Sequence, residues 1–201
     1  IDNPDLVIST IYLSDLLEIL TPIPKYNLSV CNKLKYNGLI LCYIVLAQER
    51  ALKENWSFYP SADIMFNRIS EQKSFSPFTI SPGKTIITAE ITCKPDSIAY
   101  YEIETSIKER VLKDLKKVGI LKKEECIDFF TKHSKRVYPI YDLDFRKNLT
   151  TTLDYIHSFD NLYTLGRQGL FNYNNTDHCM DMANKFVKHI TSQKSKEEWK
   201  E

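Results

Sequence analysis

The sequence has few glycines and lacks the short motifs of several common enzyme classes. Five glycines occur among 201 residues. None of them stands in a G-x-G-x-x-G or Walker-type loop, so these residues alone cannot cradle a dinucleotide pyrophosphate in the usual way. A G-x-S-x-G elbow and an H-E-x-x-H helix are also absent. The sequence therefore contains none of the phosphate, acyl-transfer or zinc sites that these motifs mark.

Cysteine spacing, net charge and hydropathy exclude further classes. The five cysteines are scattered, odd in number and never spaced C-x-x-C, which argues against a disulfide framework and against a metal site. The formal charge is +1, so no strong positive field favours a nucleic-acid partner. No apolar run approaches the roughly 18 residues of a membrane span. We expect a cytoplasmic protein with reduced thiols, no metal, no nucleic acid and no membrane span.

Hydrophobic periodicity predicts an α+β fold with a mixed or antiparallel sheet and helices on one face. Leu6–Ser9 reads as a parallel strand covered on both faces. The other expected strands are Leu39–Leu46, Trp56–Tyr59, Met65–Ile69, Thr85–Cys93, Glu125–Thr131 continued by Arg136–Ile140, and Asn161–Leu165. The expected helices are Ser14–Leu20, Tyr101–Val118, Phe145–Ile156 and Asn175–Thr191.

Two of these helices carry a clear apolar stripe. In the helix expected at Tyr101–Val118, the stripe consists of Ile103, Ile107, Val111, Leu112, Leu115 and Val118. In the last, the residues expected to face inward are Cys179, Met182, Phe186, Val187 and Ile190. The first strand and the final strand, turn and helix resemble the edge of a nucleotide-binding domain. Because the chain starts at Ile1 and enters a strand almost at once, we expect it to be a carboxy-terminal piece or a processed product.

The stretch from Gly166 to Met180 is the most informative one for function. It follows an apolar strand and leads into a helix, and free N–H groups at a helix start favour anions. Arg167 adds a planar charged fork suited to phosphate, although a surface arginine would look the same. Asp177 is either a first-turn acid favoured by the helix dipole or an acceptor for polyol hydroxyls. Tyr173 is either a core residue or a ligand.

Several segments together resemble a known family. Arg68-Ile-Ser-Glu-Gln-Lys73, Tyr138-Pro-Ile140 and Gly166–Met180 occur in this order in UDP-galactopyranose mutases and flavin amine-oxidase-like proteins. Leu6–Thr10 and Leu34–Ile40 also look like that class. The resemblance implies that the last strand and helix complete a Rossmann-like FAD-binding domain.

The same resemblance implies a set of substrate-binding residues. An arginine matching Arg68 reaches toward flavin and substrate in the mutases. A Tyr-Pro tyrosine, the Gly-Arg arginine and a later tyrosine bind the substrate diphosphate there, and they match Tyr138, Arg167 and Tyr173. The resemblance therefore implies a sugar-nucleotide-like substrate. No catalytic residue is assigned.

The resemblance also implies cofactor contacts with FAD at the Gly166-Arg167 turn and the helix that follows. The aspartate matching Asp177 hydrogen-bonds the flavin ribityl chain. Backbone N–H groups matching His178 and Cys179 face the flavin pyrimidine. The positive end of the helix dipole would stabilise negative charge on a reduced flavin, which is an independent physical reason for this arrangement.

The organisation expected from these matches has four parts. Residues 1–24 form the edge of the FAD-binding domain, residues 25–140 the substrate-binding sheet domain, residues 141–192 a return to the FAD-binding domain, and residues 193–201 a frayed tail. The chain would be the substrate-binding portion of an FAD-dependent mutase or oxidoreductase. Such an enzyme would need a missing N-terminal FAD-binding segment, so the fragment alone would bind FAD weakly or not at all.

One departure from the mutase pattern and two alternatives remain. Mutases read roughly Tyr-x-Tyr-Tyr-Asp-Met-Asp where this chain has Phe171-Asn-Tyr-Asn-Asn-Thr-Asp177, a form nearer to oxidoreductase-like relatives of cell-surface polysaccharide pathways. The first alternative function is a non-catalytic module, derived from a flavoprotein, that binds a sugar nucleotide or a partner. The second is a structural domain in which the Gly-Arg turn is a coincidence.

Overall fold

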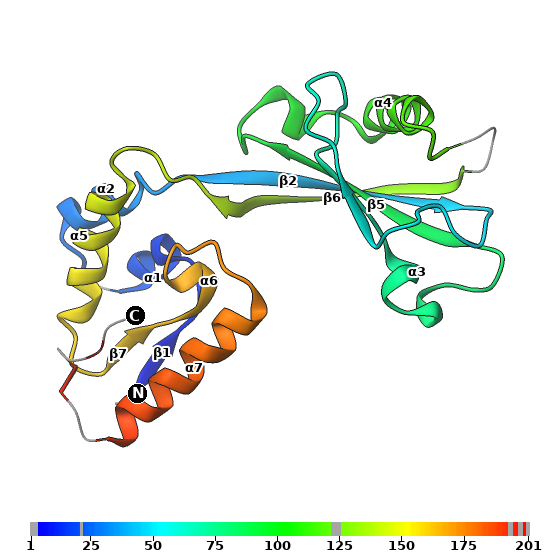
Figure 1. The fold of residues 1–201 in the computed structure, drawn as a ribbon. Coiled ribbons are helices and arrows are strands. Elements are labelled where there is room, and N and C mark those ends of the chain that lie inside the picture. Colours follow the sequence, from blue (N-terminus) through cyan, green and yellow to red (C-terminus); the bar gives the residue numbers. More distant parts are fainter. Residues whose placement is uncertain (1–3, 21, 122–125, 193–194, 197–198, 200–201) are drawn as a thin grey trace. The chain divides into compact units, whose positions relative to one another are not determined.

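The computed structural model describes residues 4–20, 22–121, 126–192, 195–196 and 199. The chain forms two compact units (Figure 1). One unit, here called the terminal unit, combines Ile1–Lys35 with Tyr138–Glu201, and the other, the sheet unit, comprises Tyr36–Val137. An α+β fold with an antiparallel sheet was predicted from the sequence, and the structure confirms it.

The sheet unit contains five strands in the order β3-β4-β5-β2-β6. Its elements are β2 (Tyr36–Leu46), β3 (Trp56–Phe58), β4 (Arg68–Glu71), α3 (Gln72–Phe75), η1 (Pro77–Thr79), β5 (Thr85–Cys93), η2 (Ile98–Tyr101), α4 (Glu104–Lys117) and β6 (Cys126–Pro139), the last of which ends in the terminal unit. The long strands β2 and β5 pair antiparallel, with Cys42 opposite Ala89 and Ile44 opposite Ile87. The strand predicted at Leu39–Leu46 is thus confirmed as part of β2, which lies between β5 and β6.

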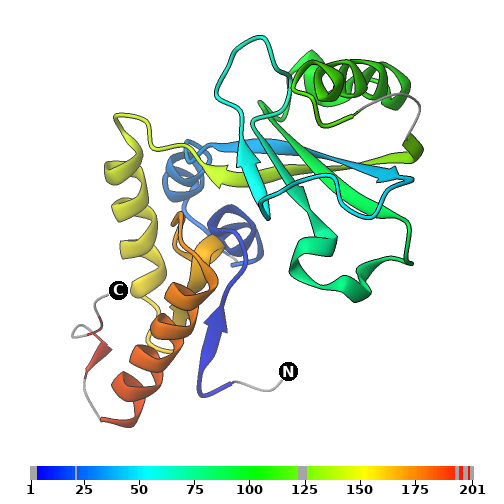
Figure 2. The same ribbon diagram turned by 45° about the vertical axis from the view of Figure 1, so that its right-hand side comes forward.

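Helix α4 packs along one face of this sheet, as Figures 1 and 2 both show. Its residues Ile107, Val111 and Leu115 are fully buried in the core shared with the alternating apolar side chains of the strands. Ile103 is 70% exposed, so its predicted place in the stripe is wrong. It lies at the N-cap, one residue before the helix begins, and therefore does not share the helical periodicity of the stripe.

The sixth strand differs from its prediction. The sequence indicated one strand with a bend between Thr131 and Arg136, whereas β6 runs as a single assigned strand from Cys126 to Pro139. The predicted start at Glu125 lies outside the described residues. Hydrogen bonding to β2 keeps the polar middle of β6 extended although its own hydropathy pattern is weak.

The terminal unit is built around two parallel strands. Its elements are β1 (Val7–Ser9), α1 (Leu13–Ile19), α2 (Lys25–Cys31), α5 (Phe145–His157), β7 (Leu162–Thr164), α6 (Gly166–Gly169) and α7 (Thr176–Thr191). Val7 pairs with Leu162 in a parallel register, so the prediction of a parallel first strand is confirmed. Its burial on both faces is not, because Val7 and Ile8 are 36% and 47% exposed. Within the described residues, β7 is the one strand that pairs with β1.

The boundaries between the two units lie after Lys35 and after Val137. The sequence had placed the domain boundaries after residues 24 and 140. The reason is α2, a helix that the sequence analysis missed: it packs against α5 and buries Val30 and Cys31 in the terminal unit. A hydrogen bond of 2.8 Å from the N–H of Ile140 to the carbonyl of Lys35 joins the two chain segments where they enter this unit.

The end of the chain departs from the predicted frayed tail at 193–201. Residues 193–194, 197–198 and 200–201 of that range lie outside the described residues. Trp199 packs edge-on against Phe186 of α7, with ring centroids 5.4 Å apart. The ammonium of Lys196 donates to the carbonyl of Leu162 at 2.7 Å. At these two described positions the chain is therefore docked on the terminal unit.

Candidate functional site

The site begins where β7 ends. Gly166 has a φ of +79°, a conformation that residues with a side chain rarely adopt. It turns the chain from the strand into the one-turn helix α6, in place of the simple turn that the sequence predicted. The guanidinium of Arg167, the second residue of α6, can therefore reach the segment that precedes α7.

Gly169 allows α6 to pack closely on both strands. A Cβ at this position would lie 2.6 Å from Oγ1 of Thr164 and 3.1 Å from the carbonyl oxygen of Ser9. The Thr164 hydroxyl cannot easily move, because it donates a 2.6 Å hydrogen bond to the carbonyl of Gly169.

We expect Gly169→Ala to lower the free energy of unfolding by about 1–2 kcal/mol, because overpacking must push α6 away from the strands. The φ of Gly169 is not positive, so the expected loss comes from the close contacts and not from backbone strain. Urea unfolding of the variant and the wild type measures the difference. A Gly169→Ala protein as stable as the wild type would contradict the close-packing argument.

Three of the four predicted substrate residues meet in the terminal unit. The guanidinium of the half-buried Arg167 lies 4.6 Å from the ring centroid of Tyr173 and 5.6 Å from that of Tyr138. The two tyrosine centroids are 5.6 Å apart. One arginine nitrogen, Nη1, donates to the carbonyl of Asn174 at 2.6 Å. The cation thus lies beside two aromatic rings that also contact each other, directly before the start of α7.

Arg68, the fourth predicted residue, lies in the sheet unit. It stands on β4 opposite Glu90 on β5. Its Nε and Nη2 donate to the same Glu90 oxygen at 2.9 and 2.7 Å, and its guanidinium lies 5.8 Å from the ring centroid of Phe58. This arginine therefore has a carboxylate partner within its own sheet.

The other charged residues of the Arg68–Lys73 segment organise the loop after β2. Glu71 is fully buried and accepts hydrogen bonds from the N–H groups of Ala51 and Leu52 and from the hydroxyl of Thr85. The ammonium of Lys73 pairs with Glu49 and donates to a backbone carbonyl. The acid and the base of this motif thus have a structural task.

The start of α7 differs from the arrangement that the resemblance implied. The side chain of Asn175, the N-cap residue, accepts from the N–H of His178, and the imidazole Nδ1 of His178 accepts from the N–H of Asn175 at 3.1 Å. The N–H of Cys179 donates to the carbonyl of Asn175. The N–H groups of His178 and Cys179 are therefore already bonded within the helix. The first-turn N–H groups left for a ligand are those of Thr176 and Asp177, and the Asp177 side chain is exposed.

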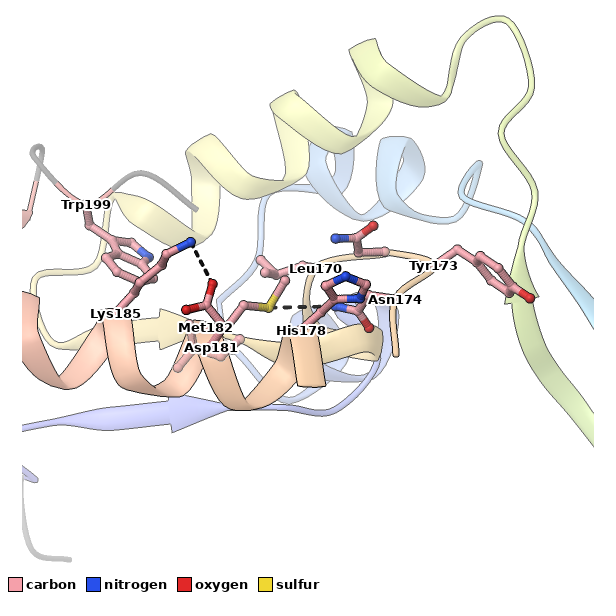
Figure 3. Close-up of a pocket in the computed structure, with 10 residues that line it drawn as sticks. Leu170, Tyr173, Asn174, His178, Asp181, Met182, Lys185 and Trp199 are labelled. Carbon is pink, nitrogen blue, oxygen red and sulfur yellow. Dashed lines mark hydrogen bonds and ion pairs between the residues drawn. The ribbon is translucent and has the colours of Figure 1, made fainter. Parts of the chain in front are cut away.

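A pocket of about 340 Å³ lies beside the first turns of α7 (Figure 3). Its lining includes Asn174, His178 and Met182, together with the ion pair of Asp181 and Lys185, whose charged atoms are 2.7 Å apart. The Lys185 ammonium lowers the pKa of the Asp181 carboxyl. In Figure 3 the ring of Tyr173 extends away from these side chains, and the residues that line the pocket do not include Arg167 or Tyr138.

Tyr141 is a site residue that the sequence analysis missed. Its hydroxyl accepts from the N–H of Tyr173 at 2.7 Å, and its ring lies against Phe145 and Phe171. Tyrosine is common in this chain, with 12 in all, so its type alone carried no signal. Its position three residues after Tyr138 was the available clue.

The thiols and metal-binding groups add no second site. All five cysteines, each within the described residues, are free. Burial raises the pKa of Cys31 to about 11 and that of Cys42 to about 12, so both are poor nucleophiles at neutral pH. The part of the chain that the structure describes contains no cluster of three His, Cys, Asp or Glu side chains suited to a metal. It also contains no helix long and apolar enough to cross a membrane.

Comparison with known proteins identifies the family. The UDP-galactopyranose mutase family model matches residues 19–124, which is more than half of the chain. The chain belongs to the UDP-galactopyranose mutase family. The matched stretch includes Arg68 and ends before Tyr138, Arg167 and Tyr173. The family match therefore does not cover these last three residues. Their assignment as site residues depends on their positions in the structure and on the resemblance of the Gly166–Met180 motif. A search of curated proteins found no match.

Solved structures show the same fold. A reduced UDP-galactopyranose mutase matches with a TM-score of 0.81 at 18% identity, over 94% of this chain and 41% of that chain. An oxidoreductase from Methanosarcina mazei (TM-score 0.61, 16% identity) and a putrescine oxidase variant redesigned in cofactor binding (0.61, 12%) each match over 94% of this chain and 43% of theirs. The mutase-family chain thus spans less than half the length of these proteins, and its fold is common to mutases and oxidases.

Proposed function

We propose that this chain is the substrate-binding, carboxy-terminal portion of an FAD-dependent mutase or oxidoreductase that acts on a sugar nucleotide. The observation that carries the proposal is the Arg167 guanidinium clustered with the rings of Tyr138 and Tyr173, beside the start of α7, in a chain of the UDP-galactopyranose mutase family. Cell-surface polysaccharide synthesis is the pathway class that we propose for it.

The cluster suits a diphosphate because of its donors. A guanidinium offers paired N–H groups to phosphate oxygens, and each tyrosine hydroxyl offers one more donor. The aromatic faces hold the cation in place without competing for its N–H groups as carboxylates would. Arg167, Tyr138 and Tyr173 would bind the diphosphate, and Arg68 is proposed as a further substrate-binding residue on the strength of the family resemblance.

The residues present also fit one edge of a flavin. Asp177 offers an exposed carboxylate to ribityl hydroxyls, and the N–H groups of Thr176 and Asp177 point from the positive end of a 16-residue helix. Gly166 and Arg167 shape the adjoining turn. His178 and Cys179 act through the helix cap rather than through free N–H groups. A bound flavin supplies the electron-pair or hydride chemistry that these side chains lack.

The remainder of the binding surface must come from other sequence. The 201 residues hold no glycine-rich dinucleotide loop. Strand β1 is parallel to β7, and among the described residues it pairs with a neighbour along one edge alone. Its residues Val7 and Ile8 are exposed. Both features fit a sheet that continues with further strands. We propose that a preceding FAD-binding segment adds to β1 and supplies the pyrophosphate loop.

The test is the flavin content and nucleotide affinity of the full-length protein. We expect it to purify with stoichiometric FAD, and we expect UDP to perturb the flavin absorbance on titration. The isolated 201-residue chain should bind FAD weakly or not at all. UDP binding without any flavin would favour a non-catalytic module. Absence of both in the full-length protein would contradict the proposal.

A second measurement separates the two chemistries. With the flavin reduced and oxygen excluded, a mutase would interconvert the ring forms of a UDP-sugar without net oxidation. An oxidoreductase would instead bleach an oxidised flavin when its substrate is added. Chromatography of the sugar nucleotide and flavin absorbance distinguish these outcomes.

A further inference from the structure

The loop between α6 and α7 contains a backbone conformation that calls for an explanation. Phe171 has a φ of +49°, the one non-glycine residue with positive φ among those described. This left-handed conformation is costly for a bulky aromatic residue. Strain of this kind persists only where the surroundings hold the residue in place.

The end of α6 explains why a left-handed residue is needed. The N–H of Asn172 donates to the carbonyl of Arg167 at 2.9 Å, and the N–H of Phe171 donates to the carbonyl of Gln168 at 3.4 Å. This pair of bonds is the Schellman arrangement, in which glycine usually occupies the left-handed position. Here the position is taken by Phe171, whose side chain is 1% exposed.

Tyr141 holds this strained turn from outside. Its ring contacts Phe171 edge-on at 6.0 Å between centroids, and it lies against Phe145, the first residue of α5, at 4.6 Å. Its hydroxyl accepts from the N–H of Tyr173 at 2.7 Å and, in a longer contact of 3.5 Å, donates to the carbonyl of Phe171. One hydroxyl thus bridges the two residues that flank Asn172.

The bridge fixes the direction in which Tyr173 leaves the loop. Tyr173 is 58% exposed, so packing alone holds its ring weakly. Its backbone N–H is anchored by Tyr141, and its ring then lies over the Arg167 guanidinium. Tyr138, which lies three residues before Tyr141 in the sequence, supplies the second ring beside that cation.

We infer that Tyr141 is a positioning residue of the diphosphate site: it keeps Tyr173 over Arg167 by bridging the strained turn at Phe171. The inference rests on the proposed function, since it assigns to Tyr141 the ordering of a site that binds a diphosphate. Tyr141 acts through its contacts with Tyr173 and Phe171.

The experiment compares Tyr141→Phe with a matched control in the full-length protein. Tyr141→Phe keeps the ring and removes the bridging hydroxyl. Tyr155→Phe is the control, because it removes a hydroxyl that donates to the carbonyl of Pro22, elsewhere in the same unit. UDP is the probe, and equilibrium titration gives its dissociation constant. The resonance of the Arg167 side-chain N–H reports on the ring of Tyr173, since protons above an aromatic face shift upfield.

We expect Tyr141→Phe to weaken UDP binding about three- to tenfold, the range for one lost hydrogen bond, with Tyr155→Phe unchanged. The Arg167 side-chain N–H resonance should shift in the ligand-free Tyr141→Phe protein. The midpoint of thermal unfolding of Tyr141→Phe should stay close to that of Tyr155→Phe. Equal UDP binding by Tyr141→Phe and wild type would overturn the inference and leave the proposed function standing. Weaker binding with an unmoved Arg167 resonance would also overturn it. A wild-type protein that does not bind UDP would overturn both.

Discussion

Arg167→Ala is expected to weaken UDP binding by the full-length protein by about 1.5–3 kcal/mol, or roughly ten- to 150-fold. The reason is the loss of a charged hydrogen-bond donor suited to phosphate oxygens. Tyr138 and Tyr173 would keep their hydroxyls but lose the cation beside their rings. Titration with UDP, monitored by flavin absorbance, measures the change.

Two companion variants define what the loss means. Arg167→Lys keeps the charge but cannot form a paired contact with phosphate, so we expect an intermediate affinity. Arg110→Ala removes an equal charge from an arginine whose partner is Glu102 in the sheet unit, and we expect no change in UDP affinity. If Arg110→Ala weakened binding as much as Arg167→Ala, the effect would be one of net charge. An unchanged affinity in Arg167→Ala would support a coincidental Gly-Arg turn.

Glu71→Ala is expected to lower the free energy of unfolding by about 3 kcal/mol. The Glu71 side chain is fully buried, and its oxygens accept from the N–H groups of Ala51 and Leu52, the Thr85 hydroxyl and the Nε of Arg50. Removing the carboxylate leaves the buried N–H of Leu52 and the buried hydroxyl of Thr85 without their acceptor. Urea unfolding measures the loss.

The same carboxylate predicts a pH dependence. Burial raises the pKa of Glu71, but the hydrogen bonds from Thr85, Ala51, Leu52 and Arg50 outweigh it and hold the pKa below its ordinary value. A carboxyl with a lowered folded-state pKa contributes stability above its unfolded pKa, and this contribution is lost as the pH falls through the folded pKa. Unfolding free energies measured from neutral to acidic pH should therefore fall more steeply in the wild type than in Glu71→Gln.

An exposed acid in the same unit provides the control. Asp63 pairs with Lys117, and both side chains are at least half exposed. We expect Asp63→Ala to have a much smaller effect than Glu71→Ala, because water replaces the lost contacts. Similar losses in the two variants would contradict the argument from burial.

Much of the fold could be predicted from the sequence where one periodicity dominated. The alternating apolar residues of β2 and β5 and the stripe of α4 each indicate one structure, and each is found. Helix α2 was missed because it spans only Lys25–Cys31 after two closely spaced prolines and has a short apolar pattern. Its stability comes from packing on α5, which local sequence does not show.

The candidate site was predictable in part for the same reason. Arg167 was found through its glycine neighbours, and Tyr138 and Tyr173 through a resemblance that their own patterns could not supply. Tyr141 was missed because its role depends on a bridge between residues 30 and 32 positions away in the sequence. The capping role of His178 was missed because it requires knowledge of which residue is the N-cap. Contacts fixed by tertiary structure were thus the ones that the sequence left open.

The central claim is that Arg167, Tyr138 and Tyr173 together bind the diphosphate of a sugar nucleotide. A crystal structure of the full-length flavoprotein with UDP bound tests it most directly. The account predicts a phosphate oxygen within hydrogen-bond distance of the Arg167 guanidinium and of at least one of the two tyrosine hydroxyls. The claim would be contradicted if UDP bound with its phosphates away from Arg167 and the guanidinium kept only its contacts within the chain.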